Sequence, residues 1–292
     1  MKYFAAACAI FGYAAAADAG VPIAVFHGLG DNCHNPGMHS FTKELGEQTN
    51  AYSKCIKIGA AGGTLDSIFE NFEKQAETGC EQINEDPNFQ GEFNVVGLSQ
   101  GAILARNIVS RCQMKGTVRN WLSIGGPNMG VSDIPHCFHG TICKMVNAVV
   151  RSVVYNGFIQ NIVGPAGYFR DPQHMDEYLK GSVFLAAENN EKGTDEEKAA
   201  VKARFSALNG AMLVMFTEDS MVYPKESEWF QQLDHTMEAT QPLEDSDFYK
   251  NDFIGLKALT EAKKVTQVSI EGDHLQFSQD DVKNTFVPFL LS

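Results

Sequence analysis

Residues 97–101 of this chain, GLSQG, have the spacing of a turn that presents a nucleophilic serine. In the pattern G-x-S-x-G the serine lies on a strained turn between a strand and a helix, and its hydroxyl is exposed at the edge of a sheet. The apolar residues 93–96 before the turn and the helically spaced residues 102–112 after it fit that context. The pattern predicts Ser99 as the nucleophile of acyl transfer. A glycine-rich turn without catalytic function is the alternative.

The position of His274 makes it the predicted general base. Eight histidines are present, but in this architecture the three residues follow in the order serine, acid, histidine, which excludes the three histidines before Ser99. Of the other five, only His274 lies in a loop directly after a late apolar segment, residues 265–270. Such a loop ends beside the serine turn, where an imidazole can accept the serine proton.

The acid that orients this histidine is expected after the apolar segment 211–216. It would hold the imidazole in the correct tautomer and stabilise the imidazolium. Glu218 and Asp219 both lie there, and Asp219 is preferred because aspartate is the shorter and commoner choice. Asp273 is a third candidate, although side chains of adjacent residues such as Asp273 and His274 seldom face each other.

Backbone amides are the expected donors to the oxygen of the tetrahedral intermediate. One amide belongs to the residue after the nucleophile, Gln100, and the other comes from the glycine loop after the first strand. Residues 27–30, HGLG, form that loop, with Leu29 as the predicted donor and His27 as a structural hydrogen-bonding residue. Loss of one such donor typically raises the barrier by about 3 to 4 kcal/mol.

The segments that must position these residues alternate between two kinds. Short apolar segments predict buried strands, and helical spacing predicts helices between them, as in residues 64–76. The predicted strands are residues 22–26, 93–96, 121–124, 211–216 and 265–270. This order predicts an α/β-hydrolase fold in one domain, residues 20–292, with a mostly parallel central sheet and helices on both faces.

Residues 128–209 interrupt this alternation and predict a helical insertion. Its first part, residues 143–163, is apolar with helical spacing, whereas residues 188–202 are charged and predict a solvated loop and helix. Ligands bind beyond the carboxyl ends of the strands in open α/β sheets. We therefore expect the insertion to form a lid over that end.

The N-terminal residues 1–19 have the pattern of a secretory signal peptide. One lysine precedes a run of small and apolar residues, and the small-x-small pattern of residues 17–19, ADA, follows. A membrane anchor is the alternative, but the run is too short and too rich in alanine for a good membrane-spanning helix. The pattern predicts entry into the secretory pathway.

Six cysteines remain after such cleavage, and an even number in an oxidising compartment predicts three disulfides. Six cysteines allow 15 pairings, so the pattern itself assigns none. A zinc cluster is the alternative for the four residues His136, Cys137, His139 and Cys143. A short disulfide loop is the preferred interpretation, and no metal site is predicted.

The charge of the chain restricts its partners. The formal net charge of −13 is spread along the sequence and would repel a phosphate backbone, so nucleic acid is not an expected partner. The sequence contains no Asn-x-Ser/Thr acceptor, so N-glycosylation is not expected.

Taken in order, seven short motifs resemble the soluble palmitoyl-protein thioesterases. They are residues 27–31 HGLGD, Cys33 with residues 35–36 NP, 97–101 GLSQG, 218–220 EDS, 228–230 EWF, 254–257 IGLK and 271–276 EGDHLQ. The resemblance covers nearly the whole mature chain. It implies Ser99, Asp219 and His274 as the catalytic triad and a lysosomal or secreted enzyme that removes palmitoyl groups from S-acylated cysteines. It also implies the disulfides Cys80–Cys112 and Cys137–Cys143.

The chain departs from the animal members of this family in two places. Those enzymes have two adjacent cysteines after the first loop, whereas here His34 follows Cys33. With the other two pairs implied, Cys33 and Cys55 remain, and we expect them to pair. The animal enzymes also carry N-linked sugars, for which this chain has no acceptor, so secretion is the alternative to sorting into the lysosome by sugars.

A palmitoyl substrate needs an apolar groove, because full burial of its chain is worth on the order of 10 kcal/mol at roughly 0.8 kcal/mol per methylene. The candidate groove residues are Met145, Val149, Val153 and Phe158, which alternatively pack the insertion onto the core.

The expected partners are S-acylated proteins or peptides, the protein is expected to be a monomer, and no cofactor is required. A carboxylesterase or lipase with the same triad and an inactive lipid-binding hydrolase fold are the alternative functions.

Overall fold

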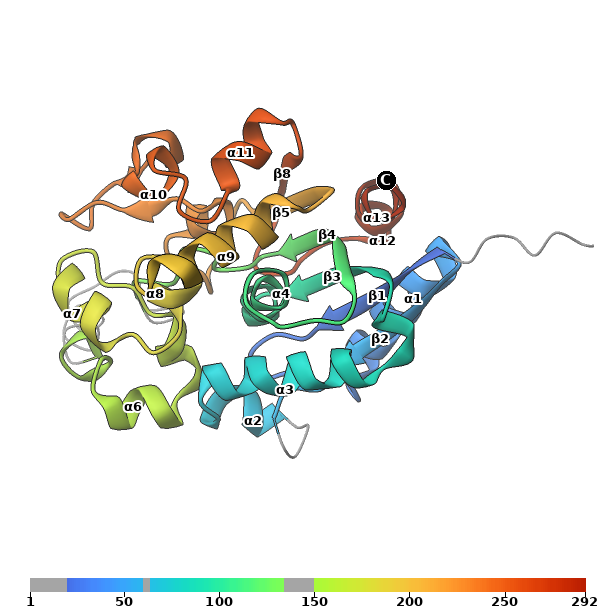
Figure 1. Ribbon diagram of the computed structural model, residues 1–292, viewed down its shortest axis with the longest axis horizontal. Coiled ribbons are helices and arrows are strands. Elements are labelled where there is room, and N and C mark those ends of the chain that lie inside the picture. Colours follow the sequence, from blue (N-terminus) through green and yellow to red (C-terminus); the bar gives the residue numbers. More distant parts are fainter. Residues whose placement is uncertain (1–19, 60–63, 134–149) are drawn as a thin grey trace, which may run out of the picture.

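A parallel β-sheet of six strands forms the centre of the computed structural model, which describes residues 20–59, 64–133 and 150–292 (Figure 1). The strand order is β2-β1-β3-β4-β5-β8, and every neighbouring pair is parallel. The strands are β1 Gly20–Phe26, β2 Ala51–Ile56, β3 Glu92–Leu98, β4 Thr117–Ile124, β5 Gly210–Phe216 and β8 Val265–Ile270. The predicted parallel sheet is confirmed, and β2 is the strand that the apolar pattern missed.

Alternating side chains bury both faces of this sheet. On β1, Ile23 and Val25 belong to one apolar cluster, whereas Ala24 and Phe26 belong to a second cluster on the opposite face. All seven residues of β5 are buried. Edge strand β2 is only half-buried and carries polar residues, so it lacks the apolar run of a buried parallel strand.

Helices cover both faces. Helix α1, Pro36–Thr49, and the C-terminal helix α13, Val287–Leu291, contact each other on one face. Helices α3, Phe72–Glu85, α4, Gln100–Ser110, and α9, Asp195–Ser206, lie on the other face, where α4 packs between α3 and α9 (Figure 1). The predicted helices on both faces are therefore confirmed.

The expected helix over residues 64–76 is two helices. Helix α2 spans Thr64–Phe69, and α3 begins at Phe72. The Asn71 side chain accepts a hydrogen bond from the Lys74 amide and caps α3, so the chain changes direction between the two. The spacing of apolar residues continues across this break and conceals it.

The insertion after β4 lies beyond the carboxyl ends of the strands (Figure 1). Its described part includes helical residues 150–153, and the regular elements after them are α6 Gly157–Ile162, η2 Gly164–Tyr168, α7 Met175–Gly181 and α8 Leu185–Glu188. The expected single helix over residues 143–163 is interrupted, because the Asn156 side chain caps α6. Helix α9, which sequence spacing had grouped with the insertion, packs beside α4 as part of the layer that covers the sheet.

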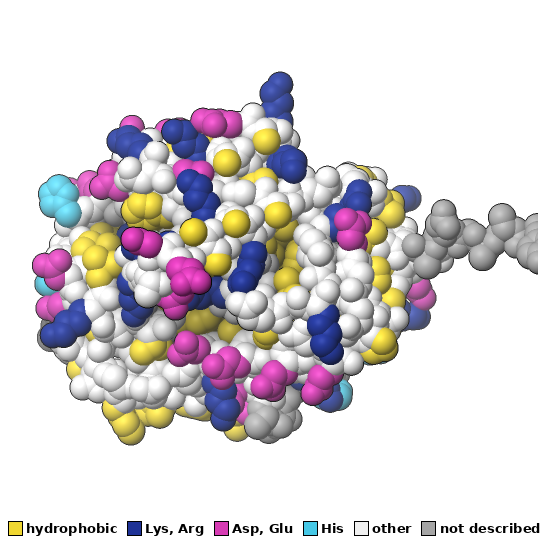
Figure 2. Space-filling model, in the orientation of Figure 1, with side chains coloured by type: hydrophobic (Ala, Val, Ile, Leu, Met, Phe, Trp, Pro, Cys, Tyr) yellow, Lys and Arg dark blue, Asp and Glu magenta, His cyan; other side chains and the backbone are white. Residues whose placement is uncertain are grey.

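The charged stretch 188–202 is solvated only in part. Glu188 is fully buried and pairs with Arg106 of α4, contrary to the sequence expectation, whereas α9 carries the exposed charges. Exposed apolar residues occur on α6, where Phe158 and Ile162 face outward. Figure 2 shows apolar side chains gathered at the lower left of this view, over α6.

Smaller elements complete the C-terminal part of the chain. Two-residue strands β6, Gln232–Leu233, and β7, Thr240–Gln241, form an antiparallel pair. The remaining elements there are η3 Lys225–Trp229, η4 Leu243–Asp245, α10 Asp247–Lys250, α11 Leu256–Glu261, α12 Gln279–Asp281 and η5 Val282–Phe286, and η1 Pro87–Phe89 precedes β3.

Two disulfides tie loops to the regular elements. Cys33–Cys55 joins the loop after β1 to β2, and Cys80–Cys112 joins α3 to the end of α4. These are two of the three expected pairs. The third, Cys137–Cys143, and the alternative zinc cluster around it lie outside the described residues. Over the described ranges, no helix is both long enough and apolar enough to cross a membrane.

Candidate active site

Ser99 occupies a strained turn between β3 and α4. Its backbone has φ 53° and ψ −126°, a conformation that non-glycine residues rarely adopt. A Cβ on Gly97 would lie 2.3 Å from the Cα of Ala102, and one on Gly101 would lie 2.4 Å from the Phe26 carbonyl oxygen. Both glycines are therefore required for strand and helix to approach closely enough to form the turn.

Ser99, His274 and Asp219 form one chain of hydrogen bonds. The Nε2 atom of His274 lies 2.8 Å from Ser99 Oγ, and its Nδ1 atom lies 2.5 Å from Asp219 Oδ2. The three residues follow β3, β8 and β5, whose carboxyl ends lie at the same edge of the sheet. The structure thus brings together three side chains that are up to 175 positions apart in the sequence.

Asp219 is held on both sides. Its Oδ1 atom accepts hydrogen bonds of 2.7 Å from the amides of Met221 and Val222, which leaves Oδ2 for His274. Burial raises the pKa of Asp219, but the hydrogen bonds that it accepts outweigh burial and leave its pKa below the ordinary value. Asp219 is therefore ionised at neutral pH and able to orient the imidazole.

The two other acid candidates point elsewhere. Glu218 is exposed to solvent. The Asp273 carboxylate accepts hydrogen bonds from the Ser220 amide at 2.8 Å, the Ser220 hydroxyl at 2.9 Å and the His274 amide at 2.7 Å. Asp273 therefore ties the loop that carries His274 to the loop that carries Asp219.

Gln100, the residue after Ser99, is fixed by its side chain as well as by the helix. Its buried amide donates to the Ser67 carbonyl at 3.0 Å and to Gln75 Oε1 at 3.1 Å, and it accepts from the Tyr168 hydroxyl at 3.0 Å. Burial raises the pKa of Tyr168, so this phenol remains a donor. The backbone amide of Gln100 lies in the first turn of α4, where amides have no partner within the helix.

The loop that contains Leu29 lies against the same turn. Its neighbour Gly30 donates a hydrogen bond of 2.8 Å to Ser67 Oγ, and the His27 ring donates from Nδ1 to the Gly28 carbonyl at 3.0 Å. Ser67 therefore connects this loop to Gln100. Leu29 itself lines the cavity at Ser99.

A cavity of about 250 Å³ opens beside Ser99 and His274. Most of its lining is apolar, with contributions from Leu29, Val131, Pro165, Tyr168, Met221 and Leu275. Two of these, Pro165 and Tyr168, belong to η2 of the insertion. The site therefore offers an apolar surface directly beside the serine hydroxyl.

The predicted groove residues on α6 and before it do not line this cavity. Val153 is 43% exposed and Phe158 is 70% exposed, and neither lines the cavity. On α6 the buried residue is Gln160, and Ile159 is partly buried against the core. The Gln160 side chain donates to the carbonyls of Val154 and Ala166, which fixes the orientation of α6 with Phe158 exposed. Met145 and Val149 lie outside the described residues.

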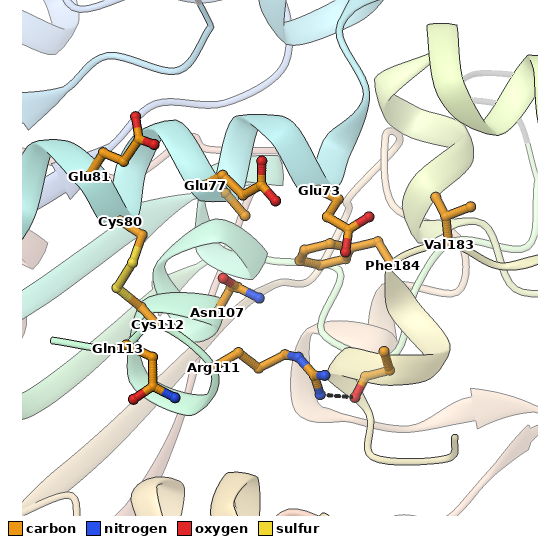
Figure 3. A pocket seen from close by; sticks show the side chains of 12 residues that line it. Glu73, Glu77, Cys80, Glu81, Asn107, Arg111, Cys112, Gln113, Val183 and Phe184 are labelled. Atoms are coloured by element: carbon orange, nitrogen blue, oxygen red, sulfur yellow. Dashed lines mark hydrogen bonds between the residues drawn. A yellow bond between two sulfur atoms is a disulfide. The ribbon is translucent and has the colours of Figure 1, made fainter. Parts of the chain in front are cut away.

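A second cavity, with a larger volume of about 380 Å³, lies between helices α3, α4 and α8 (Figure 3). Three acids of α3, Glu73, Glu77 and Glu81, lie along it, and Arg111 donates to the Ala187 carbonyl on its far side. Among the described residues its lining includes no serine or histidine, and its two cysteines are joined in a disulfide. Of these two cavities, the smaller one is lined by the serine and the histidine expected for acyl transfer.

Comparison with known proteins matches this chain to one family. The family model for palmitoyl protein thioesterase matches residues 22–274, which include the serine turn, Asp219 and His274. The chain belongs to the palmitoyl protein thioesterase family. It is therefore a hydrolase of thioesters or esters with an α/β-hydrolase fold.

Known relatives of this family member match almost the whole length of the chain. It is 33% identical to "Palmitoyl-protein thioesterase 1" of Caenorhabditis elegans over 91% of its own length and 90% of the relative. It is 31% identical to "Palmitoyl-protein thioesterase 3" of Dictyostelium discoideum over 84% and 81%, and 26% identical to "Lysosomal thioesterase PPT2 homolog" of Drosophila melanogaster over 92% and 91%. Among solved structures, a monoacylglycerol lipase of Paleococcus ferrophilus is similar over 94% of the chain, with 12% identity and a TM-score of 0.49.

The residues that support the site of this thioesterase-family chain have no signal in the sequence. Ser67, Gln75 and Tyr168 hold Gln100, yet their positions in the sequence follow no motif. Glu228, a buried acid beside Asp219, belongs to the EWF motif, but that motif does not indicate where its side chain lies. The position of such residues depends on packing between distant segments.

Proposed function

We propose that this chain hydrolyses the thioester that links a long fatty acyl group to a cysteine of a protein or peptide. The observation that carries the proposal is the hydrogen-bonded chain Ser99–His274–Asp219, which ends at an apolar cavity. Family membership and the names of the relatives support the thioester as the substrate class.

The reaction proceeds in two steps. Ser99 Oγ attacks the acyl carbon while His274 Nε2 accepts its proton, and Asp219 stabilises the imidazolium that forms. The carbon–sulfur bond then breaks and the sulfur leaves as a thiolate, whose departure needs little protonation because the pKa of a free cysteine is about 8.5. The His274 imidazolium gives its proton to this thiolate, so the imidazole is neutral again before water enters. Water attacks the acyl-enzyme with His274 as base, the fatty acid leaves, and the proton returns to Ser99.

The oxygen of the tetrahedral intermediate is stabilised by the backbone amides of Gln100 and Leu29 in this proposal. The Gln100 amide lies at the start of α4, where the helix dipole also favours negative charge. The side-chain network from Gln100 through Ser67 to the loop at residue 30 would hold the two amides at a constant separation.

The acyl chain would occupy the cavity beside Ser99, with the insertion as a lid that contributes Pro165 and Tyr168. Each methylene removed from water there contributes roughly 0.8 kcal/mol to binding. We place the enzyme in the lysosome or outside the cell. The two disulfides, the pattern of residues 1–19 and the lysosomal relatives support this assignment.

Substitution of Ser99 tests the proposal. Ser99→Ala is expected to reduce kcat for a palmitoylated cysteine peptide by at least about 1,000-fold, since the nucleophile is lost, while the melting temperature stays near that of the wild type. The wild type is expected to react with a fluorophosphonate at Ser99 and to hydrolyse the thioester faster than a matched palmitoyl serine ester. Full activity of Ser99→Ala would refute the triad. Faster hydrolysis of the oxygen ester would favour a carboxylesterase or lipase, and a folded protein without labelling or hydrolysis would favour a lipid-binding protein.

A further inference from the structure

Glu228 is a fully buried acid directly beside the proposed triad. It lies in η3, and its Oε2 atom accepts a hydrogen bond of 3.1 Å from the Phe216 amide. Carboxylate oxygens of Glu228 and Asp219 and a ring nitrogen of His274 lie within 4.8 Å of one another. Two acids and one imidazole therefore share one small buried volume.

The other oxygen of this carboxyl group, Oε1, is buried and finds no donor in the part of the chain that the structure describes. A buried carboxylate oxygen without a donor is costly, and a second ionised carboxylate next to Asp219 would add repulsion. A proton on Oε1 removes both problems at once. It converts the unpartnered atom into a donor on a carboxyl group that has an oxygen within 4.8 Å of an Asp219 carboxylate oxygen.

The surroundings of Glu228 place the shared proton on this residue and not on Asp219. Burial and the neighbouring Asp219 raise the pKa of Glu228 to about 11, and Glu226 on the same turn acts in the same direction. Lys225 is a cation on the same turn, but its ammonium group is directed to the Thr217 carbonyl, to which it donates at 2.6 Å. Asp219, in contrast, accepts backbone amides and His274, and these favour its ionised form.

We propose that Glu228 is a positioning residue: its protonated carboxyl donates a hydrogen bond to Asp219, holds it against His274 and keeps it ionised. The proposal rests on the function proposed above, because Glu228 acts through the triad and does not touch the substrate. A neutral donor supports the Asp219 charge without competing with it for the His274 imidazole. The main-chain carbonyl of Glu228 accepts from Asn128 Nδ2 at 2.9 Å, which fixes the segment that carries the donor.

The matched pair Glu228→Gln and Glu228→Leu tests the donor. Glutamine keeps an oxygen for the Phe216 amide and supplies an N–H for Asp219, so kcat is expected within about threefold of the wild type, with an unchanged pH profile. Leucine keeps the bulk but removes the donor. Loss of a hydrogen bond to a charged group is expected to lower kcat by about 10- to 100-fold.

The pH profile separates positioning from a structural effect. Without the donor, Asp219 becomes more basic and the His274 cation is better stabilised, so the apparent pKa values of the coupled pair rise. The acid limb of kcat/KM in Glu228→Leu is therefore expected to move to higher pH by about one unit. Glu226→Gln, which removes a nearby charge but no donor to Asp219, is the control and should leave the acid limb in place.

Two kinetic results would overturn the proposal: an unchanged rate and acid limb in Glu228→Leu, or an equal loss in Glu228→Gln and Glu228→Leu. If Glu228→Leu does not fold, infrared spectroscopy of the wild type and Glu228→Gln decides. A protonated-carboxyl band at neutral pH that is missing from Glu228→Gln supports the proposal, and its absence from the wild type refutes it. Failure of the proposed function is distinguishable, because it would appear as retained activity in Ser99→Ala.

Discussion

The central sheet and the insertion after β4 share apolar contacts but differ in their buried polar contacts. Apolar side chains cover both faces of the sheet. Trp121 on β4, for example, is fully buried in one of these two clusters. The insertion joins one of these apolar clusters through residues such as Tyr168 and Phe184, and buried charge attaches it to α4 in addition. Arg106 of α4 pairs with Glu188 at 3.2 Å and donates to the Asn128 carbonyl and to Asn189 Oδ1, each at 2.8 Å.

The polar network of the insertion affects the active site, because the insertion contributes part of the cavity lining. Apolar contacts are non-directional, so many arrangements of an apolar layer are similar in free energy, whereas a network of hydrogen bonds has one favoured geometry. The insertion carries Pro165 and Tyr168 of the active-site cavity, and a second buried pair, Arg170–Glu191 at 2.8 Å, lies within it. We expect the polar network to fix the orientation of the insertion and the sheet core to supply most of the stability.

Breaking the buried pair should have the largest effect on stability. Glu188→Ala leaves the Arg106 guanidinium buried without its partner and removes the acceptor for Asn107 and Ser110, so the free energy of unfolding should fall by about 3 to 5 kcal/mol. Urea unfolding at neutral pH measures this change. The double variant Arg106→Met with Glu188→Met should recover part of the loss, because it leaves no uncompensated charge but does leave Asn107 and Asn189 without these partners. A loss below about 1 kcal/mol in the single variant would contradict the assignment.

A cavity in the sheet core should have the next largest effect on the free energy of unfolding, but it should leave KM unchanged. Leu122→Ala removes a fully buried side chain from β4 and should lower the free energy of unfolding by about 3 kcal/mol. Leu122 does not line the active-site cavity, so KM of the folded variant should equal that of the wild type. Glu188→Ala, in contrast, should raise KM as well. The comparison would fail if Leu122→Ala raised KM and Glu188→Ala did not.

A partly exposed ion pair at the sheet edge should have a smaller, pH-dependent effect. Burial raises the pKa of Asp86, but Lys54 at 2.8 Å, Asn88 and Tyr52 outweigh it and lower the pKa to about 2. A pKa below the unfolded value of about 3.9 means that the stabilisation is present above pH 4 and is lost as the pH falls toward 2.

The variant Asp86→Asn should therefore lose about 1 kcal/mol of stability at pH 7 and show less change between pH 4 and pH 2 than the wild type. Urea midpoints at the three pH values measure both quantities. Parallel acid transitions in the two proteins would show that Asp86 is not responsible for this part of the pH dependence.

The smallest effect is expected at the exposed apolar surface of α6. Phe158→Ser replaces a side chain that is 70% exposed, so the free energy of unfolding should change by less than about 0.5 kcal/mol. KM for short- and long-chain acyl thioesters should also remain unchanged, because Phe158 does not line the cavity at Ser99. A rise in KM confined to long chains would show that the acyl chain extends onto α6.

Several features of the site follow from local sequence. The GLSQG turn, the apolar strands before it and before His274, and the order of the three residues were predicted because each depends on a short stretch of chain. The choice between Glu218 and Asp219 was not determined by that pattern. The two side chains leave the backbone in different directions, and only the fold determines which one faces the imidazole.

Local residue patterns are sufficient to predict the periodic part of this protein: buried strands, amphipathic helices and a serine turn, each encoded by residues that are near one another in the chain. The contacts of Arg106 with Glu188, of Gln100 with Tyr168 and of Glu228 with Asp219 emerge only when the chain is folded. Periodicity carries no information on such pairs, because a buried polar group is stable only where the packing of distant segments supplies its partner.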